Sequence, residues 1–371
     1  MICAPAARAV RLGPVATFIS ILGAIVLGTG VVFFFASNWQ LLPAWFKVAL
    51  VFVSTAVAYA AGYLLQFRST VLPRVGAALI FLGALLFQAG IFLLAQIFNM
   101  PVNSPIALLL GAAGILPLAY VVGSRVVLAL AIVDALAWLG WQLFNRYPEP
   151  PQVFAVPLMY ILAGIVVYCA SHWHRLRAGA NSFASVYEML GLAAMLIPVY
   201  ALSYGGFWES AQRSDLDQLR VPFWFPATVA LALAAAASLM LGRRDDRVVW
   251  AEAFAFGAIA LCVALVAYVR GWADGYALLF NGVYFGLALL ACVRGYLEGE
   301  ARFVNLGIPA IAIGLVTRYF DTFWDLLPRS AFYIIGGLVL LAVAAGLERL
   351  RRRLLSNIGG AGGGMATEAR P

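Results

Sequence analysis

Long apolar stretches alternate with short polar gaps along the whole chain. Each stretch is close to the roughly 20 residues that a helix needs to cross a hydrocarbon core of about 30 Å. Backbone groups inside lipid must be hydrogen-bonded within their own segment, so these stretches are predicted to be helices. Twelve spans are predicted, at 15–37, 44–66, 73–96, 105–123, 126–144, 153–171, 184–204, 223–242, 249–269, 275–293, 302–320 and 330–348.

Composition strengthens this interpretation, because 64% of the residues are hydrophobic and only 11% are charged. Soluble domains carry about 25% charged residues. We therefore predict an all-α, polytopic integral membrane helical bundle of about 12 transmembrane helices. A cytoplasmic tail (1–14) precedes one transmembrane domain (15–348), and a basic, then flexible glycine-rich tail (349–371) follows it.

The basic residues predict the orientation. Seventeen of the 24 lysines and arginines fall in both tails and in alternate gaps, and seven fall in the other gaps. Cytoplasmic loops carry this excess, so both termini are predicted to lie inside a bacterial inner (cytoplasmic) membrane. The net charge of +8 is interpreted as an orientation signal and not as nucleic-acid binding. Anionic lipid headgroups are expected beside the basic exit of the last span, at Arg349, Arg351, Arg352 and Arg353.

Asp134 is the first candidate for chemistry inside the membrane. It lies about nine residues into the fifth span, roughly 13 Å deep at 1.5 Å per residue. An acid at that depth is costly and marks a solute pathway, a proton relay or a buried pair. Trp138, Trp141, Gln142 and Asn145 continue from it as a polar and aromatic stripe. A functional site and a structural aspartate that joins two helices both remain open.

A second group of polar residues lies at the predicted outer ends of spans one, three and eleven. It is either an outward-facing polar mouth or a set of anchors that hold helix ends at headgroup depth. Its members are Asn38, Trp39, Gln96, Asn99, Arg318, Asp321 and Asp325.

Other features are interpreted as packing. Gly76, Gly83 and Gly90 recur every seven residues and predict a smooth seam for a neighbouring helix. His172 and His174 are interpreted as interfacial, because residues two apart on a helix do not face each other as metal ligands do. The isolated polar residues Gln88, Asn281, Glu188 and Glu252 are expected to join helices or to lie at the inner interface.

Several runs resemble a known family. These are GVVFFFASNW (30–39), AQIFN (95–99), RYFD (318–321) and LLP (326–328). They are similar to a bacterial multi-pass family catalogued as domain of unknown function 2157, over roughly 15–105 and 295–355. The resemblance implies a polytopic inner-membrane protein and brings no activity with it.

No enzymatic activity is predicted. The chain has no G-x-x-x-x-G-K-[ST], H-E-x-x-H, G-x-S-x-G or C-x-x-C motif, and its only lysine is Lys47 on the predicted outer side. No catalytic residue, cofactor or metal is therefore expected. The first functional hypothesis is a secondary transporter or permease of a small solute or lipid. The alternative is a non-transporting membrane protein, such as an assembly, sensing or envelope-regulatory subunit, whose protein partners the sequence does not identify.

Overall fold

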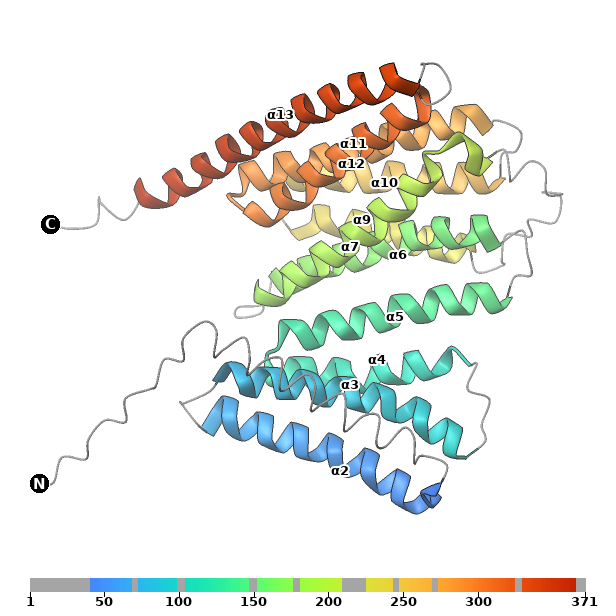
Figure 1. Cartoon of the computed structure of the whole chain (residues 1–371), viewed down its shortest axis with the longest axis vertical. Coiled ribbons are helices and arrows are strands. Elements are labelled where there is room, and N and C mark those ends of the chain that lie inside the picture. Colours follow the sequence, from blue (N-terminus) through green and yellow to red (C-terminus); the bar gives the residue numbers. More distant parts are fainter. Residues whose placement is uncertain are drawn as a thin grey trace, which may run out of the picture. The chain divides into compact units, whose positions relative to one another are not determined.

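The computed structural model describes residues 41–68, 73–98, 104–146, 152–175, 181–208, 225–242, 247–268, 273–323 and 329–364. All regular structure in these residues is helical, which confirms the predicted class (Figure 1). Nine of the described helices are long and apolar enough to cross a membrane, and two more, Ile106–Val122 and Phe225–Leu239, are apolar but shorter. The predicted span at 15–37 lies outside the described residues, so the count of twelve stays a prediction.

The chain forms two compact units, Met1–Asn103 and Ser104–Pro371. Hydropathy identifies spans without showing which helices pack together, so the predicted single transmembrane domain over 15–348 stays a prediction beside this division into two units. In the first unit the described elements are α2 (Ala44–Tyr63), a π-helical turn η2 (Leu64–Arg68) and α3 (Pro73–Ile97).

The glycine seam of α3 packs against α2 and its π-helical turn. A Cβ atom on Gly83 would lie 2.6 Å from the ring of Tyr59, and one on Gly90 would lie 2.7 Å from Cγ1 of Val51. Gly76 faces the backbone of Gln66 in the same way. The predicted seam is thus confirmed, and its partner is the preceding helix. Small residues at these positions let the two backbones approach closely.

The second unit contains nine described helices. Except at the end of α13, their bounds agree with the predicted spans to within a few residues, because apolar length is a local property of the sequence. In chain order they are α4 (Ile106–Val122), α5 (Arg125–Arg146), α6 (Gln152–Arg175), α7 (Asn181–Leu202), α9 (Phe225–Gly242), α10 (Arg247–Tyr268), α11 (Ala273–Leu297), α12 (Ala301–Phe323) and α13 (Arg329–Gly364).

The last helix departs most from the prediction. α13 does not end near 348 but continues through Gly364, so the segment predicted as a flexible tail is helical over most of its length. Glu348 explains part of the extension, since it pairs with Arg352 at 2.7 Å and with Arg351 at 3.7 Å. Such i,i+3 and i,i+4 pairs, together with the high helix propensity of Leu and Arg, sustain a helix across this region.

The core of the second unit is built around the α6–α7 hairpin. Gly164 and Gly191 bring these helices together, because a Cβ on Gly164 would lie 2.8 Å from the carbonyl oxygen of Gly191. Met195 of α7, Phe256 of α10 and Phe280 of α11 are fully buried in the same core. α6 also packs against α10, and α7 packs against α11 and α12. The end of α6 and the first turns of α7 thereby lie near the start of α10, the end of α11 and the start of α12.

Candidate functional site

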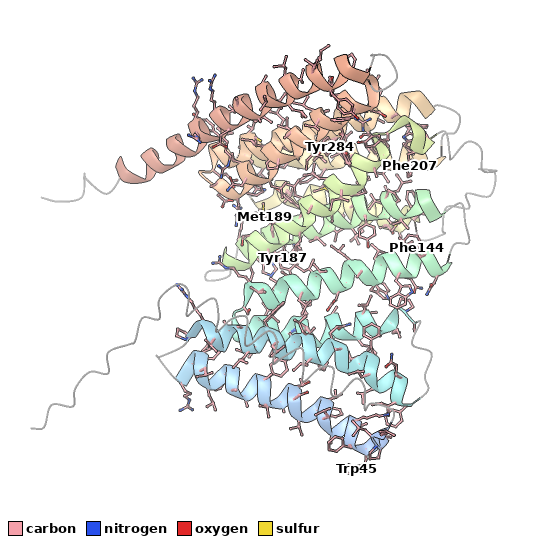
Figure 2. The ribbon with its side chains drawn as sticks, in the orientation of Figure 1. Trp45, Phe144, Tyr187, Met189, Phe207 and Tyr284 are labelled. Carbon is pink, nitrogen blue, oxygen red and sulfur yellow. The ribbon has the colours of Figure 1, made fainter. Side chains whose placement is uncertain are left out.

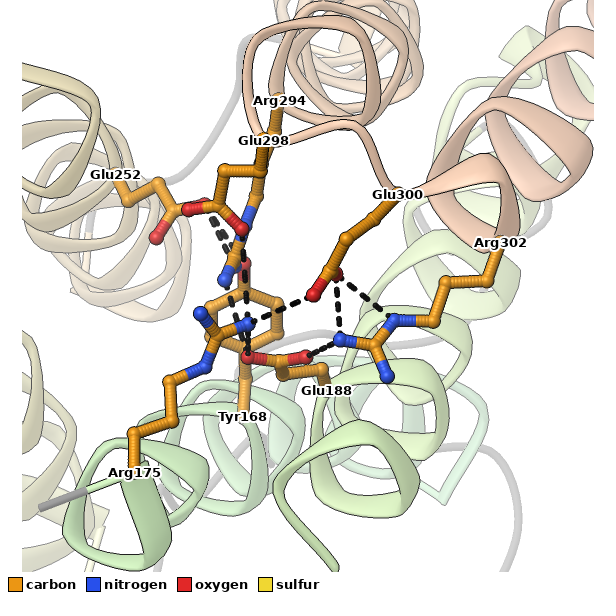
Figure 3. Close-up of polar contacts among 8 residues, drawn as sticks. All are labelled: Tyr168, Arg175, Glu188, Glu252, Arg294, Glu298, Glu300 and Arg302. Carbon is orange, nitrogen blue, oxygen red and sulfur yellow. Dashed lines mark hydrogen bonds and ion pairs between the residues drawn. The ribbon is translucent and has the colours of Figure 1, made fainter. Parts of the chain in front are cut away.

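Glu188 is the centre of a buried ionic network (Figure 3). Its side chain is completely inaccessible to solvent, although it lies only two turns into α7. Oε1 is 2.5 Å from Nη2 of Arg175 and 3.0 Å from Nη2 of Arg294, and Oε2 is 2.8 Å from Nη2 of Arg302. These arginines come from α6, α11 and α12, so one carboxylate joins four helices.

Arg294 extends the network to α10. Its Nη1 lies 2.8 Å from Oε1 of Glu252, which also accepts a hydrogen bond of 2.7 Å from the Tyr168 hydroxyl. Its Nε donates to Oε2 of Glu298, one helical turn further along. The guanidinium carbon lies 4.4 Å from the centre of the Phe303 ring, close enough for a cation–π contact. Arg294 is therefore surrounded by three carboxylates and the Phe303 ring, although its Nη1 pairs with Glu252 by charge and makes no hydrogen bond of good geometry among the described residues.

The turn between α11 and α12 supplies the more exposed members. Gly299 adopts a positive φ of 70°, which reverses the chain between Glu298 and Glu300. Nε and Nη2 of Arg302 both donate to Oε2 of Glu300, at 3.0 and 2.5 Å. Arg175 lies 3.6 Å from Glu298 and 3.7 Å from Glu300. The short turn thus closes the network on the side nearer to solvent.

The network contains four carboxylates and three guanidiniums, and it is tightly packed. A cavity of about 20 Å³ lies beside Tyr168, Ser171, Glu252 and Arg294, which is room for about one water molecule. Desolvating so many charges is expensive, and buried ion pairs often stabilise a fold no better than apolar residues of similar volume. The arrangement can therefore hold five helix ends together in one defined state, and it leaves no space for a larger ligand in that state.

Asp134 lies on α5, as predicted, and only 7% of its surface is exposed. Its Oδ2 atom is buried without a hydrogen-bond partner among the described residues. Trp138 and Trp141 are half-buried, whereas Gln142 and Asn145 are exposed. The predicted stripe thus runs from a buried carboxylate to exposed amides, and its role stays a prediction.

Part of the predicted outer group is ordered around Arg318. Nη1 donates to Oδ2 of Asp321 at 3.0 Å, and Nη2 donates to Oγ of Ser203 at 2.8 Å. The guanidinium carbon lies 3.7 Å from the centre of the Tyr204 ring. Arg318 therefore contacts the end of α7, which the sequence did not indicate. Gln96 is exposed and belongs to the other compact unit, and Asn38, Trp39, Asn99 and Asp325 lie outside the described residues.

The two histidines differ in their surroundings. His172 is buried, while His174 stacks on Tyr187 and its Nε2 lies 2.6 Å from the Tyr120 hydroxyl. The hydroxyls of Tyr120 and Tyr187 are 2.7 Å apart, so this group links α4, α6 and α7. No three His, Cys, Asp or Glu side chains are grouped for metal binding in the described part of the chain.

The sequence did not predict the ionic network as one site. Glu188 and Glu252 were interpreted separately as helix contacts or interfacial residues, and Arg175, Arg294 and Arg302 only as orientation signals. A usable signal was present, because all of them fall at span ends assigned to the same side of the membrane. Their mutual contacts depend on the rotation of each helix, and a single sequence does not specify this rotation.

These features define a class: a polytopic helical membrane protein whose charged residues are gathered at the helix ends. Residues 4–128 match the model of a family described as "Predicted membrane protein (DUF2157)". The match confirms the resemblance over that stretch; residues 295–355, which also carried it, lie outside the match. The family has no established activity. No curated protein and no solved structure matches the chain.

Proposed function

We propose that the protein is a secondary transporter or permease of a small solute or lipid. It has twelve spans with both termini in the cytoplasm, lies in a bacterial inner membrane, and performs no catalysis. The observation that carries the proposal is the Glu188 network, which closes one end of the second unit. Ionisable residues within membrane helices mark pathways, relays and gates, because a purely structural contact is made at lower cost by apolar side chains.

A network of this kind suits a gate. Transport requires two states, and the helix ends must separate in one of them. Ion pairs between four different helices and a fifth helix end favour the closed state as a unit, and hydration of the same charges favours the open one. Apolar side chains at the same place would not stabilise the open state in this way, because exposing them to water is unfavourable.

The contacts also support the predicted topology. If successive spans alternate in direction, the end of α6 and the starts of α7, α10 and α12 face the same side, together with the end of α11. Arg175, Glu188, Glu252, Arg294 and Arg302 occupy those ends and contact one another. The basic residues of this side give it the cytoplasmic assignment.

Asp134 is the proposed coupling site. A buried carboxylate that has an oxygen without a hydrogen-bond partner is suited to bind a proton or a small cation reversibly. The network and Asp134 then have different tasks, since the first closes the pathway and the second responds to the ion.

Uptake by proteoliposomes tests the proposal. Charge movement is recorded on a supported membrane after addition of amino acids, sugars, organic anions or nucleosides, and transfer of a fluorescent phospholipid between leaflets is followed separately. We expect one of these classes of solute or lipid to give charge movement or transfer between leaflets that requires the protein. This signal should be lost in Asp134→Asn. Glu188→Gln should keep the protein folded and change the rate.

A second measurement needs no substrate. In a background without the four native cysteines, Ser171→Cys is placed beside the network and Ala260→Cys, a fully buried position of α10, is the matched control. Inside-out vesicles are treated with a membrane-impermeant maleimide. A gate predicts faster labelling at Ser171→Cys, and faster still with Glu188→Gln. The non-transporting alternative is supported if the maleimide labels both cysteines equally slowly and if no solute or lipid gives a transport signal.

A further inference from the structure

An apolar groove of about 780 Å³ lies between α7 and α12, with Tyr284 of α11 at its floor. Figure 2 labels two of its lining residues, Met189 and Tyr284. Its volume is within the ~300–1,000 Å³ that is usual for small-molecule sites. The middle of the groove is lined by aliphatic side chains, which include Ala193, Ile197, Leu306, Pro309 and Ile313.

The groove has the length of one lipid leaflet. Along α12 its lining runs from Arg302 to Ile313, and along α7 from Met189 to Tyr200. Each stretch advances by eleven residues, which is about 16 Å at 1.5 Å per residue. One half of a hydrocarbon core of about 30 Å is of the same length. An acyl chain lying along the helices therefore fits the groove from end to end.

The two ends of the groove differ in chemistry. Arg302 and Asn305 lie at the end near the start of α12, and Tyr200 lies at the other. Arg302 uses Nε and Nη2 for Glu188 and Glu300, and its Nη1 points away from these contacts in Figure 3. Nε of Arg351 on α13 donates to Oδ1 of Asn305 at 3.0 Å, which brings a second guanidinium to this end. The groove thus has one polar, positively charged end at Arg302 and Asn305, and its aliphatic part begins next to this end.

We propose that this groove is a binding site for one anionic glycerophospholipid. An acyl chain lies between α7 and α12, and the phosphate is held by the guanidiniums of Arg302 and Arg351 and by the amide of Asn305. Arg349, Arg352 and Arg353 lie within two residues of Arg351 on α13 and add positive potential near this end of the groove. Basic pockets between membrane helices recognise headgroups in this way. The site does not require that the protein transports, because Arg351, Asn305 and the aliphatic lining lie outside the network, and only Arg302 belongs to both.

Native mass spectrometry of the delipidated full chain tests the site, with phosphatidylglycerol and phosphatidylcholine of identical acyl chains as the two probes. We expect tighter binding of phosphatidylglycerol. Arg351→Gln should weaken it by about fivefold, the usual contribution of one basic residue at an anionic surface. Arg125→Gln is the matched control, since Arg125 is exposed at the start of α5 and does not line the groove.

The aliphatic part of the groove is tested separately. Ala193→Trp should fill the groove and abolish the preferred binding of phosphatidylglycerol, whereas Ala258→Trp, at an exposed alanine of α10 outside the groove, should leave it unchanged. Size-exclusion profiles and melting temperatures check that the variants fold. If Ala193→Trp does not fold, Arg351→Gln still decides, because Arg351 lies outside the buried network. Equal affinity for the two lipids, or full binding in Arg351→Gln, overturns the proposal.

Discussion

Arg294 is the residue whose removal tests the energetic reasoning most directly. Its side chain is only 6% exposed, and it contacts Glu188, Glu252 and Glu298 at 3.0, 2.8 and 3.1 Å. Arg294→Met keeps an unbranched apolar side chain of similar length. It leaves four carboxylates facing two guanidiniums. Removal of one partner from a buried ion pair costs about 3–5 kcal/mol, because the other charge stays buried without compensation.

The assay is equilibrium unfolding in mixed micelles, with increasing sodium dodecyl sulfate against a mild detergent and helix content as the signal. Arg352→Met is the control, because that side chain is exposed and solvent screens its pair with Glu348. We expect Arg294→Met to lower the free energy of unfolding by about 3–5 kcal/mol, and Arg352→Met to leave it unchanged within error. The reasoning is refuted if the two variants are equally stable.

A double-mutant cycle separates the ion pair from simple loss of packing. Glu252→Gln removes one of the carboxylates that Arg294→Met leaves uncompensated, so the double variant should be less destabilised than the sum of the single variants. Contacting residues of one network couple by about 0.5–3 kcal/mol. Additivity within about 0.5 kcal/mol means that Arg294 acts through its volume and not through its charge.

Three further predictions concern other parts of the chain. Asp134→Asn should insert and melt like the unmodified chain but lose any coupled uptake, and unchanged uptake in proteoliposomes makes Asp134 structural. Arg318→Ala should lower the free energy of unfolding by about 1–3 kcal/mol, because the charged hydrogen bond to Ser203 is lost; a neutral result in the micelle assay removes the outer group from consideration. Gly83→Val should cost about 1–3 kcal/mol by overpacking against Tyr59, and crosslinking of α2 to α3 should decrease.

The sequence predicted the helices far better than their contacts. The expected span 249–269 and the observed α10, Arg247–Tyr268, nearly coincide, because apolar length and helix formation in lipid are local requirements. The seam of Gly76, Gly83 and Gly90 was predictable for the same reason, since its period lies within one helix. The extension of α13 was missed because glycine weakens a helix only on average, and local pairing can offset it.

The ionic network was beyond local reasoning. Glu188 and Arg294 are 106 positions apart, and Glu188 and Arg302 are 114 apart. Sequence analysis selected Asp134 by its depth and expected Glu188 to join helices or to lie at the inner interface, without naming its partners. With the observed helix, Glu188 lies two turns from the start, where a carboxylate requires partners.

The length of α13 has a mechanical consequence. Its 36 residues extend about 54 Å, and a tilt of 40°, near the upper limit for membrane helices, still projects about 41 Å across a core of about 30 Å. The final turns therefore stand outside the hydrocarbon as a stalk. The basic residues at the end of the core-length part of this helix lie about 30–36 Å from its first residue. They are Arg349, Arg351, Arg352 and Arg353, and this distance is close to the thickness of the hydrocarbon core. The hydrogen bond from Arg351 to Asn305 ties this level of α13 to the first turns of α12.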